Sequence, residues 1–292
     1  MALERTVRLL RVPRVLLLLV LLGLFAGVGV GVQATIIEPR RLDVHRVELR
    51  IDPWSPALDG LRVALVSDLH AGSPWVDEKR IDAVVRSIEQ TAPDLIVLAG
   101  DYTINGVALG RFLPPGQVAR HLAGLHAPLG VYAVLGNHDW WNGAEAMISG
   151  LEADGITVLD NQAMAVPDPT GRRTGLWISG IADPASGHSS WRHALADVPP
   201  GAPLIAVSHQ PDVFAELPGG VSLTLAGHTH GGQIAPFGCT IATASRYGNR
   251  YVRGHVAEDG KDLFVTSGIG TSILPARLGV PPEIVLLTLH PT

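Results

Sequence analysis

The chain has 292 residues, of which 47% are hydrophobic and 17% are charged, with a formal net charge of −5 at pH 7. This composition excludes a disordered chain, and the acidic balance argues against nucleic-acid binding, which depends mainly on Lys and Arg. The single cysteine, Cys239, excludes an intrachain disulfide and a thiolate metal cluster, and we expect it to be a small packed residue.

An apolar segment near the N-terminus, Val15–Val32, is long enough to cross a membrane. Its eighteen residues carry no charge; they exceed the usual apolar core of a signal peptide and lie near the lower limit for a spanning helix. We therefore favour a retained anchor over a cleaved signal, for which Val32-Gln33-Ala34 would be a tolerable cleavage site. Four arginines precede the segment and four follow it: Arg5, Arg8, Arg11, Arg14, then Arg40, Arg41, Arg46 and Arg50.

Because large domains cross a membrane largely regardless of charge, the cationic N-terminus before the first apolar run favours a cytoplasmic N-terminus. We predict a single-pass protein of the cell membrane whose main domain is extracytoplasmic. A protease-protection test on sealed cells that finds this domain inaccessible would reverse the orientation. The chain then divides into a basic N-terminus (1–14), a transmembrane anchor or uncleaved signal (15–34), a tether with an edge strand (35–56) and one large domain (57–292).

Strand and helix patterns alternate after the anchor, which predicts an α/β protein. The predicted strands are Asp43–Ile51 at an edge, Leu61–Val66, Leu95–Ala99, Val131–Leu135, Leu204–Val207 and Val221–Ala226. The predicted helices are Asp77–Gln90, with Asp77 as the candidate N-cap, Gln117–His126 and Ala144–Ala153. From Gly231 onward, Gly-rich turns alternate with β segments at Ile234–Pro236, Leu263–Thr266 and Ile284–Leu289.

Five of the predicted strands end in side chains that bind metals. The segments are Ser67-Asp68-Leu69-His70, Gly100-Asp101, Gly136-Asn137-His138-Asp139, Ser208-His209 and Gly227-His228-Thr229-His230. Because open α/β sheets bind ligands at the carboxyl ends of their strands, these residues can converge although they lie far apart in the chain. Each segment alone is more often a turn or a structural histidine, but five in this order are not expected by chance.

A binuclear hydrolytic site needs several ligands per ion and a shared oxygen ligand that holds the ions about 3.5–4 Å apart. A carboxylate is suited to bind two ions at once because it has two oxygens and a full charge. Asp101 is the natural candidate for this shared ligand. In Asp68-x-His70 and His228-x-His230, the two side chains point the same way if the backbone is extended. The pattern therefore predicts two metal ions and a phosphate ester.

The combined set of motifs resembles the signature of the calcineurin-like metallophosphoesterases from Leu61 to Leu289, with no motif position missing. Three further segments resemble the bacterial membrane-anchored branch of that family: Gly231-Gly232-Gln233, Ser208-His209-Gln210-Pro211-Asp212 and Ile273-Leu274-Pro275-Ala276-Arg277. The resemblance implies an α/β fold that is a four-layer α/β/β/α sandwich, with two mixed β-sheets flanked by helices.

The resemblance also implies roles for the motif residues. Asp68, His70 and His230 would hold a first ion, Asn137, His209 and His228 a second, and Asp101 would lie between them. A water or hydroxide bridging the ions would attack phosphorus in line. His138 would donate a hydrogen bond or proton to the leaving oxygen, and Asp139 would either orient that histidine or cap a turn. The nitrogen and oxygen ligands suit two divalent ions of Mn, Fe or Zn and do not suit Cu(I).

Four residues outside this set are candidates for substrate contact. Trp140 and Trp141 would form a wall for an apolar substrate group or pack beneath a loop. Arg246 and Arg277 would contact a substrate phosphate through a bidentate fork or form surface ion pairs.

We predict a membrane-tethered phosphoesterase that hydrolyses phosphodiester or pyrophosphate bonds of phosphorylated small-molecule or lipid-linked substrates, with no nucleic-acid partner. The anchored branch is similar to enzymes that hydrolyse nucleotide-linked lipid precursors, whose substrates face the cytoplasm. The predicted topology instead favours envelope phosphodiesters, and both remain open. The alternatives are a catalytically silent binding module, which would be expected to lose ligands, a phosphomonoesterase of the same fold, and an exonuclease, against which the acidic balance argues.

Overall fold

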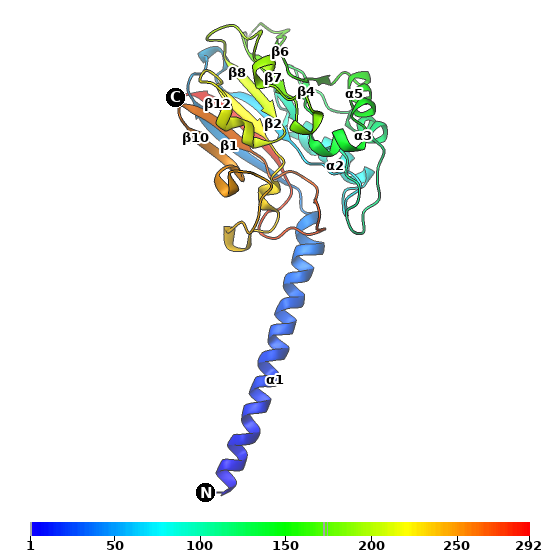
Figure 1. The fold of residues 1–292 in the computed structure, drawn as a ribbon, viewed down its shortest axis with the longest axis vertical. Helices are drawn as coiled ribbons and strands as arrows, with labels where there is room; N and C mark the ends of the chain where they lie inside the picture. Colours follow the sequence, from blue (N-terminus) through cyan, green and yellow to red (C-terminus); the bar gives the residue numbers. More distant parts are fainter. Residues whose placement is uncertain (1, 172, 174) are drawn as a thin grey trace.

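The structure is a computed structural model that describes residues 2–171, 173 and 175–292, so Met1 of the predicted basic N-terminus lies outside the described residues. Two six-stranded mixed sheets pack face to face, helices cover their outer faces, and one long helix projects from the domain (Figure 1). The predicted four-layer α/β/β/α sandwich is therefore confirmed.

The first sheet has the order β1-β12-β2-β3-β4-β5. Its strands are β1 (Asp43–Ile51), β12 (Glu283–Pro291), β2 (Leu61–Val66), β3 (Leu95–Leu98), β4 (Val131–Ala133) and β5 (Thr157–Val158). Strands β2 to β5 are parallel, and β12 runs antiparallel to β2 and parallel to β1. The strand predicted for an edge, β1, does lie at the edge of this sheet.

The second sheet has the order β10-β11-β9-β8-β7-β6. Its strands are β10 (Gly254–Glu258), β11 (Lys261–Val265), β9 (Leu223–Ala226), β8 (Leu204–Ser208), β7 (Trp177–Ile181) and β6 (Gln162–Ala165). The four central strands are parallel, and the two outer strands pair antiparallel with their neighbours. The carboxyl ends of the central strands of both sheets are therefore available to form one site.

Strand β2 shows how the layers arise from the sequence. Successive side chains of a strand point to opposite faces, so Leu65 packs between the two sheets, whereas Ala64 and Val66 pack beneath the helices. The helices that cover the first sheet are α2 (Glu78–Thr91), α3 (Pro115–Leu122) and α5 (Ala144–Ala153). The Asp77 side chain accepts a hydrogen bond from the backbone N–H of Arg80, so the predicted N-cap is confirmed.

The remaining helices are short. They are α4 (Asn137–Asn142), α6 (Trp191–Ala194) and the 3₁₀ helices Pro56–Leu58, Pro184–Ser186, Pro211–Glu216, His230–Gly232, Pro236–Gly238 and Gly248–Tyr251. Helix α4 begins directly after β4, where the sequence indicated a turn, and α6 packs with Ala206 and Leu217 against the outer face of the second sheet.

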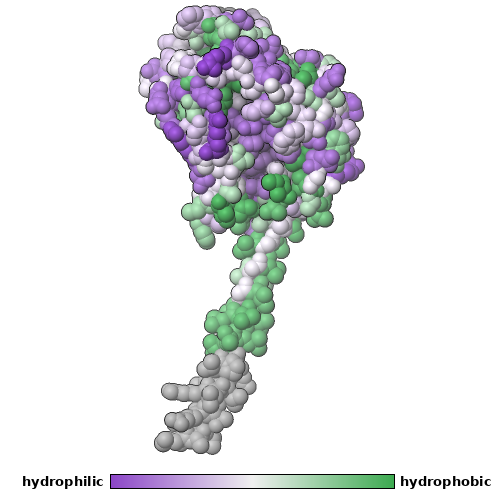
Figure 2. Space-filling model, viewed as in Figure 1, coloured by the Kyte–Doolittle hydropathy of each residue, from purple (hydrophilic) through white to green (hydrophobic). Residues whose placement is uncertain are grey.

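The long helix α1 (Ala2–Val32) continues through a π-helical turn (Gln33–Ile37) and a 3₁₀ turn (Glu38–Arg40) into the first strand. The span Val15–Arg40 reaches a mean hydropathy of 2.8, and none of its most apolar window is buried in the protein. Figure 2 shows the part of this helix from Val15 onward as an exposed hydrophobic stem. By length and composition it can cross a membrane, as the sequence predicts.

Three details of the sequence predictions differ from the structure. The strand predicted at Ile234–Pro236 is only an isolated bridge between Ile234 and Leu278, because the chain turns immediately into a 3₁₀ helix. The run Val131–Leu135 leaves the sheet after Ala133, since its last two residues lead into the next turn. Cys239 is exposed rather than packed, because it lies in a loop and not against the core.

Candidate metal centre

The seven predicted metal ligands lie in the segments that follow β2, β3, β4, β8 and β9; Asn137 is the first residue of α4 and His230 begins a 3₁₀ helix. Five of them have a left-handed backbone: Asp68 (φ 52°), His70 (φ 44°), Asp101 (φ 58°), His228 (φ 67°) and His230 (φ 52°). Non-glycine residues rarely adopt this region, and such strain concentrates at functional sites. The extended backbone that we assumed for the Asp-x-His and His-x-His pairs is therefore wrong, because the chain turns sharply at each of these residues.

One group of donor atoms comes from Asp68, His70 and His230, all of them buried. The Nε2 atoms of the two histidines lie 3.0 Å apart. Asp68 Oδ1 lies 3.7 Å from Nε2 of His70 and 3.4 Å from Nε2 of His230. Three donor atoms thus converge from the turns after β2 and β9, which belong to different sheets.

A second group consists of Asp101, His209 and His228. Nε2 of His209 lies 3.2 Å from Asp101 Oδ2 and 3.2 Å from Nδ1 of His228. Asp101 Oδ2 also lies 3.4 Å from Nε2 of His70, which belongs to the first group. The structure therefore brings the Asp101 carboxylate between the two groups, at the position from which one carboxylate can serve two ions.

Two buried oxygen atoms show that this donor set fits cations. Within the described part of the chain, Asn137 Oδ1 and Asp68 Oδ1 are buried and receive no hydrogen bond. Leaving such an acceptor unsatisfied costs about 1–3 kcal/mol, and more for a charged group. A divalent ion would satisfy both oxygens, and the surrounding imidazoles and carboxylates are ligands that Mn²⁺, Fe and Zn²⁺ accept.

The electrostatics of the centre also favours a bound cation. Burial opposes a charged imidazole, but the Asp101 and Asp68 carboxylates outweigh this and raise the pKa of His209 to about 10. His209 Nδ1 lies 2.8 Å from the Ala99 carbonyl, and an N–H donated there directs Nε2 toward the cluster. A proton on His209 therefore offsets the two carboxylates, and a divalent ion would supply that positive charge instead.

The other two histidines after β9 are suited to bind as neutral ligands. Burial lowers the pKa of His228, and it lowers the pKa of His230 well below its usual value. An imidazole must be neutral to coordinate a metal, so both residues are already in the form that coordination requires.

Asp139 holds two turns of the centre together through backbone hydrogen bonds. Its Oδ2 accepts from the N–H groups of Asp101 (2.7 Å) and Gly136 (3.0 Å), and its Oδ1 accepts from those of Tyr102 (2.8 Å) and Thr103 (3.2 Å). Burial and the neighbouring Asp101 carboxylate raise the pKa of Asp139 to about 7, although the backbone N–H groups oppose the shift. These contacts agree with the capping alternative that the sequence left open.

His138 lies at the edge of the cluster and is half-buried. Its backbone N–H donates to Asp101 Oδ1 (2.8 Å), and its ring lies 4.9 Å from the ring of His70 and 4.9 Å from that of Trp141. Burial lowers the pKa of His138 to about 4, so the ring is neutral near pH 7 and keeps one N–H to donate. Its ring thus lies beside the donor atoms, and with His70 and Asp101 it forms a third group of side chains that could hold a metal ion.

The two tryptophans after His138 have different surroundings. Trp140 packs against the core and meets the ring of His188 at 5.5 Å, whereas Trp141 is 66% exposed and lies against His138. The tryptophan that contacts His138 is therefore Trp141 rather than Trp140. Sequence position could not distinguish these neighbours, because helix α4 turns them to different sides.

The two candidate arginines also differ. Arg277 is fully buried, and it donates to the carbonyls of Ser267, Gly270 and Val280 while Nη2 lies 3.4 Å from Nδ1 of His230. The alternative of a surface ion pair is therefore wrong for this residue, because carbonyl groups solvate its charge inside the domain. Its contact with a substrate phosphate stays a prediction.

Arg246 is exposed, and its guanidinium pairs with Glu216 and lies 3.8 Å from Asp212. It lines a cavity of about 520 Å³ that also includes Ser208 and Gln210, the two neighbours of His209. Its contact with a substrate phosphate stays a prediction, since both acidic partners already compete for the guanidinium.

Glycines that precede two of the ligand segments allow close packing around the carboxylates. A Cβ added at Gly136 would lie 2.2 Å from Asp101 Oδ1, and one added at Gly227 would lie 2.5 Å from Asp68 Oδ2. Neither distance is compatible with the observed side-chain positions, so the cluster requires glycine at both places.

We expect Gly136→Ala to displace Asp101 and to lower metal affinity by about 10- to 100-fold, the range found when supporting contacts of a metal site are lost. Overpacking should also lower the free energy of unfolding by about 1–3 kcal/mol. Isothermal titration with Mn²⁺ and thermal unfolding measure the two effects. Gly116→Ala in α3 is the matched control, because its added Cβ meets open space. It should preserve metal affinity and leave the free energy of unfolding equal or up to about 1 kcal/mol higher, since alanine favours the helix. Equal metal affinity in the two variants would contradict the packing role.

The chain is similar to known proteins over most of its length. Residues 61–232 match a family model described as calcineurin-like phosphoesterase. A metallophosphoesterase of Aquifex aeolicus strain VF5 is 31% identical over 235 residues, which cover 78% of this chain and 85% of that protein. The metallophosphoesterase YkuE of Bacillus subtilis strain 168 is 30% identical, covering 92% and 93%. The UDP-2,3-diacylglucosamine pyrophosphatase LpxG of Chlamydia trachomatis serovar D is 28% identical, covering 90% and 94%.

Proposed function

The chain belongs to the calcineurin-like phosphoesterase family, and we propose that it cleaves phosphodiester or pyrophosphate bonds in lipid-linked or envelope substrates at a membrane. As a family member it is a metal-dependent phosphoester hydrolase. The observation that carries the finer proposal is the buried cluster in which Asp101 lies between two groups of donors, with two carboxyl or amide oxygens left unsatisfied.

In this proposal the chain holds two divalent ions, of Mn, Fe or Zn. Asp68, His70 and His230 would hold one, and His209 and His228 would hold the other with Asn137, whose buried Oδ1 has no hydrogen-bond partner. Asp101 would serve both ions. When bound, the ions supply Lewis acidity toward phosphoryl oxygens and lower the pKa of a coordinated water. The protein fixes the donors in advance through the strained turns and through the four backbone bonds of Asp139.

His138 acts on the leaving group in this proposal. Its neutral ring keeps an N–H that can donate to the oxygen on which negative charge develops as the bond to phosphorus breaks. Trp141 lies against that ring, with 4.9 Å between the ring centres, so it would limit the directions from which water reaches the leaving oxygen.

The membrane component of the proposal is supported by how the anchor joins the domain. The backbone N–H of Arg277 donates to the Ala34 carbonyl (2.8 Å), and Trp75 Nε1 donates to the Thr35 carbonyl (2.9 Å). Ala34 itself is buried. These contacts favour a retained anchor over cleavage after Ala34, because cleavage would remove part of a packed junction. The extracytoplasmic orientation remains the proposal that the charge pattern supports.

The proposal is tested by hydrolysis with the purified full chain in detergent. We expect Mn²⁺-dependent hydrolysis of bis(p-nitrophenyl) phosphate to exceed that of p-nitrophenyl phosphate, and we expect EDTA to abolish both. A nucleotide-linked lipid pyrophosphate and a lipid phosphodiester then discriminate between the two substrate classes. Preference for the monoester, with neither larger substrate cleaved, would identify a phosphomonoesterase. Metal binding without any hydrolysis would instead identify the silent binding module.

A further inference from the structure

The end of the large domain that surrounds α1 carries most of its exposed large apolar side chains. We call this surface the foot. Its apolar residues are Trp75, Leu109, Phe112, Phe237, Ile241, Ile273 and Leu274. Among the described residues after Arg40, Trp141 is the other large hydrophobic side chain exposed to this degree. Figure 2 shows the hydrophobic patches gathered around the base of the stem.

Hydrogen bonds fix the foot next to the end of the membrane span. Trp75 donates to the carbonyl of Thr35, and the loop of Ile273 and Leu274 leads to Arg277, whose backbone N–H donates to Ala34. Leu109 and Trp75 line the same cavity. These apolar groups are therefore at the level where the chain leaves the bilayer, which is where tryptophan is enriched in membrane proteins.

The loop of Phe237 and Ile241 joins this surface through backbone pairing. The N–H of Ala235 donates to the carbonyl of Leu278 (2.7 Å), and the N–H of Ile241 donates to that of Ile234 (3.3 Å). The exposed fraction of Phe237 exceeds nine-tenths, as does that of Leu109. Side chains this exposed bury little apolar surface within the domain. A patch of them is typical of a surface that contacts a membrane or a protein partner.

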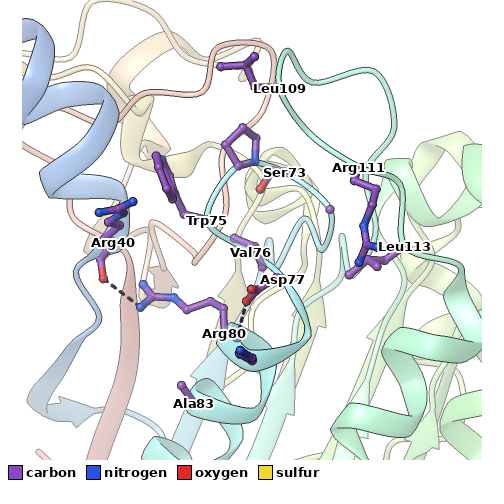
Figure 3. A pocket seen from close by; sticks show the side chains of 13 residues that line it. Arg40, Ser73, Trp75, Val76, Asp77, Arg80, Ala83, Leu109, Arg111 and Leu113 are labelled. Carbon is purple, nitrogen blue, oxygen red and sulfur yellow. Dashed lines mark hydrogen bonds between the residues drawn. The ribbon is translucent and has the colours of Figure 1, made fainter.

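Four cations line a cavity of about 500 Å³ within the foot: Arg40, Lys79, Arg80 and Arg111. The lining contains one acidic residue, Asp77, which caps α2, and the neighbouring Glu78 pairs with Arg111 (2.8 Å), so the cations still exceed the acidic groups by two. Arg80 donates to the carbonyls of Arg40 and Arg41, and the Arg40 guanidinium lies 3.8 Å from the centre of the Trp75 ring. Figure 3 shows Arg40 and Arg111 on opposite sides of the cavity and Leu109 at its rim.

We propose that the foot docks on the surface of the membrane that α1 spans, with its apolar side chains in the interfacial layer and its cationic cavity on the phosphate of an anionic lipid headgroup. The proposal rests on α1 being a retained span, which is part of the proposed function. The position of the foot at the end of α1 identifies the partner. Because α1 spans the membrane, the membrane surface is held next to the foot. The cations of the cavity complement the phosphate of an anionic lipid headgroup in the leaflet that the foot faces.

Docking would orient the metal centre toward the bilayer. Arg277 contacts the end of the anchor with its backbone and approaches His230 with its side chain, so a single residue separates the membrane span from the donor cluster. The turns that carry the ligands lie at the same end of the strands as the foot. A phosphoester held in a lipid headgroup would thus enter from the membrane side, whereas a soluble substrate would have to approach around the rim of the foot.

The native cysteine provides the test, because Cys239 lies between Phe237 and Ile241 and is exposed. The full chain, labelled there with bimane, is reconstituted in phosphatidylcholine vesicles, with or without phosphatidylglycerol, that contain doxyl-labelled lipid. We expect several-fold stronger quenching than in the control Cys239→Ser/Asp197→Cys, whose label precedes β8 at the opposite end of the strands. Phosphatidylglycerol should increase quenching at Cys239 only.

Two variants separate the apolar and cationic contributions. Leu109→Ser/Ile273→Ser should reduce quenching in both kinds of vesicle, and Lys79→Glu/Arg111→Glu should remove the increase caused by phosphatidylglycerol. Inorganic phosphate should not reverse docking, since the ligand is a headgroup. Equal quenching at positions 239 and 197, in a chain that resists carbonate extraction, would overturn the proposal while leaving the anchor intact. Hydrolysis in detergent is independent of either result.

Discussion

Replacing Asp101 with Asn is expected to lower kcat/KM by at least about 10³-fold, which corresponds to about 4 kcal/mol of lost transition-state stabilisation. The substitution keeps the shape of the side chain and its acceptor for the His138 N–H, but it removes the charge that lies between the two donor groups. Bound metal should fall from two ions per chain to one or fewer. Steady-state kinetics on bis(p-nitrophenyl) phosphate and elemental analysis measure the two effects.

The matched control is Asp59→Asn. Asp59 is exposed, pairs with His290 at 2.7 Å, and precedes β2 at the end of the strand opposite the centre. Substitutions at such surface pairs usually change the free energy of unfolding by less than about 0.5 kcal/mol. If Asp101→Asn matched this control in both metal content and turnover, Asp101 would not be a shared ligand.

His138→Ala is expected to keep both metal ions and to lose about 10²- to 10⁴-fold in kcat, the range for general acid–base assistance. The contact of His138 with Asp101 uses the backbone N–H, so the truncation leaves that hydrogen bond in place. What it removes is the ring beside His70 and the packing surface for Trp141. Metal content should therefore separate this variant from the loss of a ligand.

Comparing substrates with different leaving groups shows whether His138 donates a proton or hydrogen bond or has only a structural role. An alkyl leaving group needs a proton more than p-nitrophenolate does, so the loss in His138→Ala should be larger for an alkyl phosphodiester. His126→Ala, at an exposed histidine, serves as the control and should behave as the parent does. An equal loss for both leaving groups, or no loss for either, would remove the role assigned to His138.

Much of the fold could be predicted because its signals are local. Apolar runs of strand length followed by polar turns gave β1, β2 and β8 nearly at their observed bounds, and helical spacing with a capping aspartate gave α2. The candidate ligands could be predicted to converge for a topological reason, since carboxyl ends of parallel strands meet at one edge. Their coordinating roles stay predictions until metal is measured.

The features that could not be predicted from the sequence depend on tertiary structure. A positively charged residue in a loop is normally exposed, and only the carbonyls of Ser267, Gly270 and Val280 explain why Arg277 is buried. The left-handed backbone at Asp68 and His228 has no signature in residue type, because neither residue is glycine. The foot was missed for a similar reason: its seven apolar residues come from separate loops and form a surface only beside the anchor.

The central claim is that this chain holds two cations close enough to share Asp101. Electron paramagnetic resonance of the full chain, loaded stepwise with Mn²⁺, tests it directly. Ions about 3.5–4 Å apart are exchange-coupled, so the six-line signal of isolated Mn²⁺ should give way to a coupled spectrum as loading reaches two ions per chain. A signal of isolated ions at every loading, or saturation at a single ion, would contradict the account.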